Sequence, residues 1–256
     1  MSDKVPGVSR RKLITAGIAT AAGVSGLAVA AKIADHYGLI PPDHGGIYGV
    51  GETLTYGTQR ILMARHSMAR EFNRSDISKI ATVNGQPPQS EEYHRQEASG
   101  FADWRLKVDG LVAHPASFSM AQLKSYPART QITHQACEEG WSFIAEWSGV
   151  PLSYVLNLVG VSERAKYVFF FTIDEWWDSL DLPDAFHPQT LLAYRMNGEE
   201  ISVGHGAPVR LRVARQLGYK SLKYLTRITV TDTAKGIGDG LGSSAPSAGF
   251  SWYAGI

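Results

Sequence analysis

The sequence predicts an α+β domain built from mixed, irregular strands with short helices between some of them. Short segments in the C-terminal half alternate polar and apolar residues, a pattern typical of half-buried strands. Short helical patterns separate some of these segments along the chain. At 256 residues and 44% hydrophobic content, the chain is long and apolar enough for one domain with extensions and a substantial core.

The N-terminal segment has the composition of an export signal. It opens with basic residues and continues from Leu13 to Ala31 with small or apolar residues, interrupted only by Thr and Ser. This order is typical of a signal peptide. The run is long enough to stay in a membrane as an anchor, but its Ala and Gly content favours a cleaved signal.

The paired Arg10 and Arg11 indicate a twin-arginine signal, which exports proteins that have already folded. Ala28 and Ala30 supply a small-x-small cleavage site. We therefore predict a twin-arginine signal peptide at residues 1–30 and a periplasmic or otherwise exported protein, anchored to the membrane if the signal is not cleaved.

Residues 31–100 are expected to form an N-terminal extension and loops, because Gly, Pro and polar residues dominate there. One helix is expected in this region, roughly from Thr53 to Glu71. The composition changes after Phe101, so the main domain is predicted at 101–256, with 31–256 as one structural unit.

The main domain starts with a predicted strand at 104–112, where alternation meets an Asp-Gly turn signal. A short helix follows at 119–127, with Ser119 as its N-cap and Pro127 ending it. A second short helix is expected at 152–160. The other expected strands lie at 130–137, 167–174, 191–198, 208–216 and 225–232.

Charge and cysteine content exclude several function classes. The formal net charge is +1 and no Lys/Arg-rich run occurs beyond the first dozen residues, so we expect no nucleic-acid partner. A single cysteine cannot form an intramolecular disulfide. The glycine-bearing segments at 46–54 and 236–249 have neither the G-x-x-x-x-G-K-[ST] motif nor a G-x-G-x-x-G motif between a strand and a helix. They are therefore predicted to be loops and not phosphate-binding segments.

The single cysteine, Cys137, has polar neighbours: His134, Gln135, Glu138 and Glu139. A free cysteine is commonly a small buried hydrophobe, but such a polar strand favours another role. One alternative is a nucleophile with a histidine base. Another is a thiolate ligand to a metal whose cofactor supplies the remaining ligands. Zinc and iron-sulfur clusters are disfavoured because they normally take several cysteines.

An ordered motif decides among these alternatives. Cys137, Glu139 and Trp141 are followed by Trp147, Gly149, Val150, Pro151 and Leu152. This order resembles the C-x-E-x-W and W-x-G-x-P-L signature of the sulfite oxidase-type molybdopterin enzymes, a family that includes periplasmic methionine sulfoxide reductases. Residues 187–228 resemble the pterin-binding half of that family, and the resemblance extends from about Phe101 to Val230. Glu138 departs from it, since the family usually has an apolar residue there.

The resemblance implies a sulfite oxidase-type fold that binds molybdenum-molybdopterin, with one pterin per molybdenum. Cys137 would be the metal ligand and the catalytic residue. The implied cofactor-binding residues are Thr172, His205, Arg210, Ser221, Leu222 and Lys223, with Asn73, Ser75 and Asp76 aligned less closely in an upstream loop.

Taken singly, these residues also fit structural roles. Arg210 and Arg212 alternate with apolar residues, as surface cations on a half-buried strand would. Trp141 and Trp147 are expected to be core aromatics. Trp176 and Trp177 cannot both face inward on a regular strand. We predict that this adjacent pair lines a substrate funnel.

The implied activity is oxygen-atom transfer by an exported oxidoreductase, with reduction of a sulfoxide or another S- or N-oxide as the first choice. Sulfite oxidation is the alternative; Arg74, Arg129, Arg195 and Arg215 are candidate cations for its dianion. A non-catalytic pterin-binding redox module and a cofactor-free thiol hydrolase stay open. The oxide substrate would be a small molecule or protein-bound.

Electrons would come from a separate protein, a membrane haem protein or a soluble cytochrome, because the sequence has no C-x-x-C-H motif and no flavin fingerprint. Only about 25 residues follow the last matched strand, too few for the dimerisation domain of eukaryotic sulfite oxidases. We therefore expect a monomer.

Overall fold

The computed structural model describes residues 29, 32, 39–42, 49–62 and 67–256. The chain divides into two units, Met1–Ile40 and Pro41–Ile256, and the second contains every helix and strand discussed below. The predicted signal peptide lies outside the described residues except for Val29. Within the described part of the chain, no helix combines the length and apolarity that a membrane crossing requires.

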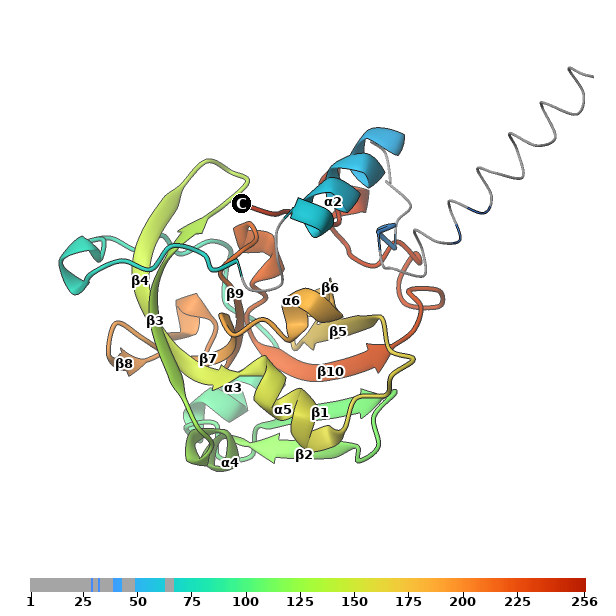
Figure 1. Cartoon of the computed structure of the whole chain (residues 1–256). Helices are drawn as coiled ribbons and strands as arrows, with labels where there is room; N and C mark the ends of the chain where they lie inside the picture. The colour runs from blue at the N-terminus through green and yellow to red at the C-terminus, as the bar shows by residue number, and fades with distance from the viewer. Residues whose placement is uncertain (1–28, 30–31, 33–38, 43–48, 63–66) are drawn as a thin grey trace, which may run out of the picture. The chain divides into compact units, whose positions relative to one another are not determined.

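Two five-stranded sheets form the framework of the second unit (Figure 1). The first sheet has the order β2-β1-β10-β5-β6, and consists of β1 (Arg105–Gly110), β2 (Ala116–Ser119), β5 (Tyr167–Thr172), β6 (Trp177–Asp181) and β10 (Leu225–Thr231). β1 and β10 pair in parallel, and the remaining pairs in this sheet are antiparallel.

The second sheet has the order β3-β4-β7-β8, and β9 also pairs with β7. Its strands are β3 (Arg129–Ala136), β4 (Ser142–Pro151), β7 (Thr190–Met196), β8 (Glu199–Glu200) and β9 (Arg210–Val213). All its pairs are antiparallel. Gly149 is required where β4 meets β7, because a Cβ there would lie 2.1 Å from the Leu192 carbonyl oxygen.

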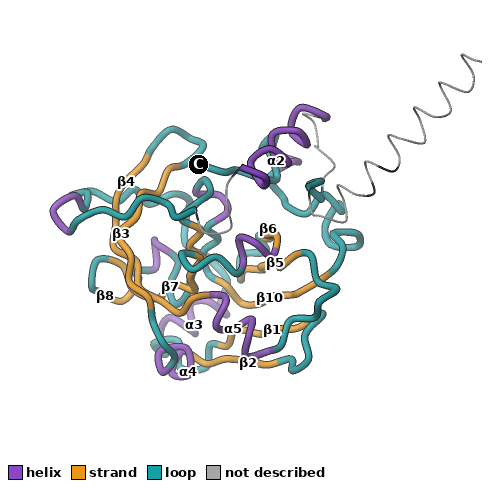
Figure 2. Tube along the Cα trace, viewed as in Figure 1, coloured by secondary structure: helices purple, strands orange, loops and turns teal. Residues whose placement is uncertain are grey.

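The helices are short; α2 and α3 precede β1 in the chain, and α4, α5 and α6 lie between strands (Figure 2). They are α2 (Val50–Leu62), α3 (Glu91–Ala98), α4 (Met120–Ser125), α5 (Leu152–Val159) and α6 (Leu182–Ala185). Single 3-10 turns occur at η2 (Arg74–Asp76), η3 (Val203–His205), η4 (Gly218–Lys220) and η5 (Pro246–Ala248). This mixture confirms the predicted α+β class.

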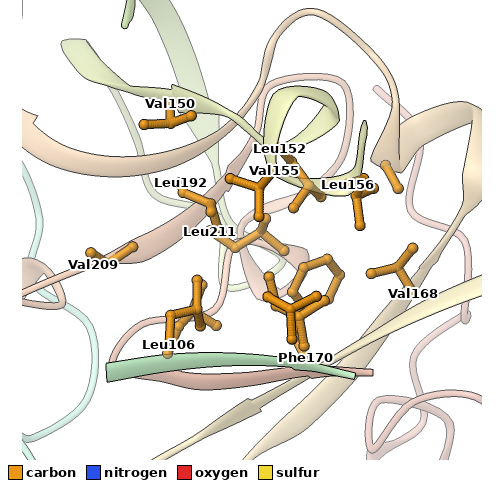
Figure 3. Close-up of a cluster of buried hydrophobic side chains, with 14 of the residues drawn as sticks. Leu106, Val150, Leu152, Val155, Leu156, Val168, Phe170, Leu192, Val209 and Leu211 are labelled. Carbon is orange, nitrogen blue, oxygen red and sulfur yellow. The ribbon is translucent and has the colours of Figure 1, made fainter. Parts of the chain in front are cut away.

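The main core joins the two sheets through α5. Leu152, Val155 and Leu156 of α5 are fully buried, and Figure 3 shows them grouped with side chains of both sheets. Leu192 and Leu211 come from the second sheet, and Val168 and Phe170 from the first. Burying such side chains contributes roughly 1.5–3 kcal/mol each, so the two sheets are packed as one unit.

The predicted helix boundaries are partly confirmed. Ser119 caps α4, since its Oγ accepts a hydrogen bond from the Gln122 N–H at 3.2 Å and its own N–H donates to the Gln122 side chain at 2.9 Å. The helix predicted at 53–71 is wrong in length. α2 ends at Leu62, and beyond the undescribed residues 63–66 the chain is extended.

A specific interaction accounts for this extended segment. The Gln189 side chain accepts from the Ala69 N–H at 2.8 Å and donates to the Ala69 carbonyl at 3.0 Å. These bonds replace the intrahelical bonds that a longer α2 would make. The segment then lies along β3 and β4, where Phe72 N–H donates to Ile132 O and Ser78 N–H to Ile144 O, both at 2.9 Å.

Six helices and strands were not predicted: α3, α6, β2, β4, β6 and β8. α3 lies in the region expected to be loop, where Ser90 caps it by accepting from the Tyr93 N–H. Tyr93 is 1% exposed and donates its hydroxyl hydrogen to the Ala207 carbonyl. A single buried aromatic therefore anchors an otherwise polar helix to the domain.

Candidate cofactor site

Cys137 lies directly after β3, in the turn that leads to β4. Its N–H donates to the Trp141 carbonyl at 2.9 Å, and its carbonyl accepts from the Gly140 N–H at 3.1 Å. η4 packs behind this turn, and a Cβ on Gly218 would lie 3.2 Å from the Ala136 carbonyl oxygen. The turn is thus held on both sides, with the Cys137 side chain only 7% exposed.

The thiol of Cys137 is protonated in this environment. Its pKa is raised to about 12, by burial first and also by the neighbouring Glu138 and Glu139 carboxylates, against the lowering effect of a hydrogen bond with the Glu139 backbone. The Sγ donates to Glu138 Oε2 at 3.1 Å. Binding a metal would require loss of this proton, which a positively charged metal strongly favours.

Cys137 forms part of the wall of a cavity of about 560 Å³. The other predicted residues that line this cavity are Thr172, His205, Arg210, Ser221, Leu222 and Lys223. They come from the end of β5, from η3, from β9 and from the loop after η4. Residues far apart in the sequence are therefore brought together around the one cysteine.

Arg210 and Lys223 are the arginine and lysine side chains that line this cavity in the described part of the chain, together with the carboxylates of Glu138, Glu139 and Asp174. Arg210 donates to the His205 carbonyl at 2.9 Å and to the Ser221 carbonyl at 2.7 Å. Lys223 donates to the Gly204 carbonyl at 2.7 Å and also to the Asn84 carbonyl. Within the described residues neither cation forms an ion pair with a carboxylate.

The electrostatics of these two cations suit an anionic ligand. Burial lowers the pKa of Arg210 to about 10. Burial and then the nearby Arg210 lower the pKa of Lys223 to about 8, against a smaller opposing effect of Asp174. A phosphate would relieve both effects, because arginine and lysine bind phosphate oxygens with charge-assisted hydrogen bonds.

His205 is held in position to meet a ligand. Its Nδ1 lies 2.9 Å from Ser202 Oγ, while its Nε2 is buried and has no partner among the described residues. Burial first, then Arg210 and Lys223, lowers the pKa of His205, against a smaller opposing effect of the Ala81 backbone. Gly206 follows with φ +108°, and a Cβ there would lie 2.9 Å from Lys223 Cβ. Glycine therefore lets the η3 turn lie against Lys223.

The hydroxyl residues are also placed and partly engaged. Thr172 Oγ1 donates to the Trp176 carbonyl at 3.0 Å, and Ser221 Oγ accepts from the Val213 N–H at 3.0 Å. Gln135 also lines the cavity, and its Oε1 is buried with no partner in the described part of the chain. Open polar atoms on the wall fit a polar cofactor such as a pterin.

Asn73, Ser75 and Asp76 are not among the lining residues of this cavity. They belong to η2 and its N-cap, where the Asp76 carboxylate accepts from the Asn73 N–H at 2.9 Å. Their assignment to cofactor binding stays a prediction. The segment that reaches the cavity from this part of the chain includes Thr82, Asn84, Gly85 and Gln86.

Other residues of the cavity wall were not predicted from the sequence. The 82–86 segment, Gln135, Asp174, Tyr219 and Tyr224 all line the cavity. Only their nearness to recognised motifs could have indicated Gln135, Tyr219 and Tyr224. The 82–86 loop carries no chemical pattern, and its position depends on tertiary contacts such as Lys223 with the Asn84 carbonyl.

The tryptophans divide between core and cavity. Trp147 is fully buried, as predicted for a core aromatic, whereas Trp141 lines the cavity. Trp176 is 61% exposed and also lines the cavity, while Trp177 stacks on Phe169. Trp176 lines the cavity and Trp177 does not, so the two neighbours do not act as a pair; a substrate funnel at this position stays a prediction.

The fold matches that of a known protein family. The family model described as an oxidoreductase molybdopterin binding domain matches residues 93–236, more than half of the chain. The chain belongs to this family. Membership confirms the predicted sulfite oxidase-type fold and the molybdopterin cofactor. The matched region includes the cavity residues from Gln135 to Tyr224.

Two curated relatives of this chain are named as protein-methionine-sulfoxide reductase subunits. A putative protein-methionine-sulfoxide reductase subunit, YedZ1, of Azospira oryzae is 37% identical over 154 residues, covering 60% of this chain and 56% of the relative. The protein-methionine-sulfoxide reductase catalytic subunit MsrP of Xanthomonas campestris pv. campestris is 36% identical over 141 residues, covering 49% and 44%. The match thus spans about half the length of these relatives.

A solved structure shows the same fold. The sulfane dehydrogenase SoxCD from Paracoccus pantotrophus matches with a TM-score of 0.50 and 26% sequence identity. The match covers 52% of this chain and 39% of that one. This likeness supports the molybdopterin-domain architecture of the two sheets.

Proposed function

We propose that this molybdopterin domain is an oxidoreductase that holds one molybdenum-pterin cofactor in the 560 Å³ cavity and reduces a sulfoxide or a related oxide. The observation that carries the proposal is that Cys137, Arg210, Lys223 and His205 line the same cavity. A thiolate donor and an anion site in the same cavity are what a molybdenum-pterin with a terminal phosphate needs.

Each residue has a defined part in holding the cofactor. Cys137 would bind the metal as a thiolate, with Glu138 Oε2 positioned 3.1 Å away to accept the thiol proton. Arg210 and Lys223 would bind the phosphate, and His205 would hydrogen-bond the cofactor through Nε2. The bound cofactor supplies two-electron oxygen-atom chemistry.

A neutral oxide suits the cavity better than sulfite does. The four arginines considered as cations for sulfite are ion-paired away from it: Arg74 with Glu146, Arg129 with Glu71, Arg195 with Glu200 and Arg215 with Asp184. Glu138, Glu139 and Asp174 line the cavity instead. These carboxylates repel a dianion, whereas a sulfoxide carries no net charge.

The reaction needs two electrons and two protons for each sulfoxide, and it yields a sulfide and water. We propose that a separate redox protein, a membrane haem protein or a soluble cytochrome, supplies the electrons. The related names of the methionine sulfoxide reductases support a sulfoxide as the substrate class, either small or protein-bound. We also propose a periplasmic location reached by the twin-arginine route, which subcellular fractionation tests.

The first prediction concerns Cys137. Protein purified from a molybdate-supplied host should contain molybdenum, and Cys137→Ala should lose about 100-fold or more of its viologen-dependent sulfoxide reduction. The lost thiolate removes the protein's bond to the metal. Elemental analysis and a panel of sulfoxides measure both effects, with Cys137→Ser as a control for side-chain size.

Other outcomes would favour the alternatives. Sulfite oxidation without sulfoxide reduction would reverse the assigned direction, and bound metal without turnover on either substrate would indicate a non-catalytic module. Activity of metal-free protein that iodoacetamide abolishes would indicate a thiol hydrolase. Full metal content in Cys137→Ala would remove the basis of the proposal.

A further inference from the structure

A second cavity, of about 480 Å³, adjoins the cofactor cavity. It is lined by residues of α2, of η4 and its N-cap, and of the segment 250–255. Glu138 and Tyr219 line both cavities. The second cavity is therefore a neighbouring chamber, and its volume lies within the range of small-molecule sites.

Aromatic rings make up much of the wall of this chamber. Tyr219 stacks on Phe250 with ring centroids 5.7 Å apart. Tyr56 and Tyr253 meet edge to face at 5.2 Å. All four side chains line the chamber. Their ring faces carry partial negative charge, which attracts cations.

Open hydrogen-bonding groups point to a polar ligand. The Tyr253 hydroxyl and Gln59 Oε1 are buried and have no partner among the described residues. Tyr253 as a whole is 7% exposed. The two oxygens converge, since they would lie 2.9 Å and 2.5 Å from a Cβ placed on Gly255. Burying such groups without a partner costs free energy, which a ligand with N–H donors would recover.

The charges of the chamber are negative. Glu52 and Glu138 contribute carboxylates, and no Lys, Arg or His is among the lining residues in the described part of the chain. Glu52 Oε1 is fixed by the Ser251 hydroxyl at 2.9 Å and the Trp252 N–H at 3.1 Å. The carboxylate is thereby oriented next to the aromatic rings.

Among the described residues, two cations contact rings of the chamber from outside its lining. Lys220 Nζ lies 6.0 Å from the Tyr219 ring centroid and is paired with Asp178. The guanidinium of Arg60 covers a face of Tyr253 at 4.5 Å from the ring centroid. Its charge is balanced by Asp181 and Asp184, each 2.6 Å from Nη2. Arg60 thus leaves the negative character of the chamber in place.

We propose that this chamber is a binding site for an organic cation of the primary alkylammonium class. Its N–H groups would donate to Gln59 Oε1, the Tyr253 hydroxyl and the carboxylates. Its carbon chain would pack on the rings of Tyr219 and Phe250. The site does not depend on the oxygen-transfer reaction, so binding can be measured whatever substrate the enzyme takes.

Saturation-transfer NMR on the cofactor-loaded protein tests the proposal. The probes are three four-carbon molecules of similar shape: the cation butylammonium, the neutral butan-1-ol and the anion butanoate. Butylammonium should bind saturably, at least about tenfold more tightly than butan-1-ol, because charge-assisted contacts contribute most of its affinity. Butanoate should not bind. Phe250→Leu keeps an apolar side chain but removes a ring face, and should weaken butylammonium binding about fivefold.

Phe72→Leu is the matched control, since Phe72 is an aromatic residue that does not line the chamber. It should leave butylammonium affinity unchanged, and equal thermal unfolding midpoints would show that both variants are folded. Equal binding of the ammonium and the alcohol would overturn the proposal. So would unchanged ammonium affinity in Phe250→Leu, or the absence of saturable binding.

Discussion

The basic side chains of Arg210 and Arg212, beside the cofactor cavity, are buried. Arg212 is fully buried and donates to Thr133 Oγ1 at 3.1 Å and to the His134 carbonyl at 2.7 Å, just before Cys137 in the chain. Arg210 and Arg212 both approach the Trp147 ring, at 5.1 Å and 5.6 Å from its centroid. These arginines are core residues, so their interpretation as surface cations is wrong.

Lys223 gives a pH-dependent prediction. Burial and Arg210 lower its pKa to about 8, so its ammonium loses its proton as the pH rises through that value. An anion needs the charged form. Sulfate, whose charge is constant, should therefore bind cofactor-free protein about tenfold more weakly at pH 9 than at pH 7.

Calorimetric titration at several pH values measures this affinity. Lys223→Met should bind sulfate weakly and with little pH dependence. Lys235→Met, at an exposed lysine away from the cavity, should behave like the parent protein. A pH profile that survives in Lys223→Met would show that another group controls anion binding.

At the residue scale, motifs predicted the parts of the wall that carry distinctive chemistry. Cys137, Arg210 and Lys223 are predictable because a metal ligand and a phosphate site require particular side chains at ordered positions. Asn84 contributes a backbone carbonyl to Lys223, and any residue can supply that group. No sequence pattern therefore indicates such a contact.

At the scale of elements, α2 is fixed to the domain by buried polar contacts. Arg60 lies 2.6 Å from both Asp181 and Asp184, and the Tyr56 hydroxyl donates to Asp181 at 2.8 Å. Gln216 donates to the same Asp184 at 2.6 Å. Burial raises the pKa of Asp181, so the arginine offsets a costly buried charge.

Arg60→Met should destabilise the protein by about 3–5 kcal/mol, because it leaves buried carboxylates without their cation. Chemical denaturation measures the loss, and hydrogen exchange should show faster exchange in α2. Arg195→Met is the control. Its pair with Glu200 is exposed, so removal should cost about 0–1 kcal/mol. Equal losses in the two variants would contradict this role of Arg60.

Elements that depend on contacts between residues close in the sequence were predicted well. Elements that depend on contacts with distant residues were not. Ser119 begins α4 because its side chain bonds within the same turn, a contact that depends on nearby sequence. The end of α2 depends on Gln189 binding Ala69, 120 residues away. β4 was missed because only its partners, β3 and β7, show which of its residues face the core.

At the scale of the whole molecule, the proposed twin-arginine signal can be tested. This route carries proteins that are already folded, so under the proposal lysine at both Arg10 and Arg11 should leave most of the protein in the cytoplasm. Immunoblots of periplasmic and cytoplasmic fractions measure the distribution. Lysine in place of Arg164, an exposed arginine of the domain, is the control and should be exported normally. Normal export of the double variant would contradict the predicted signal.

The position of β10 in its sheet has a consequence for biosynthesis. β10 lies between β1 and β5, yet it leaves the ribosome long after both; Asp109 and Arg227, which bind each other across β1 and β10, are 118 residues apart. Until translation passes Thr231, the growing chain has two unpaired strand edges that can associate with other nascent chains. Chaperones that shield these edges would therefore act before the finished protein takes up its cofactor.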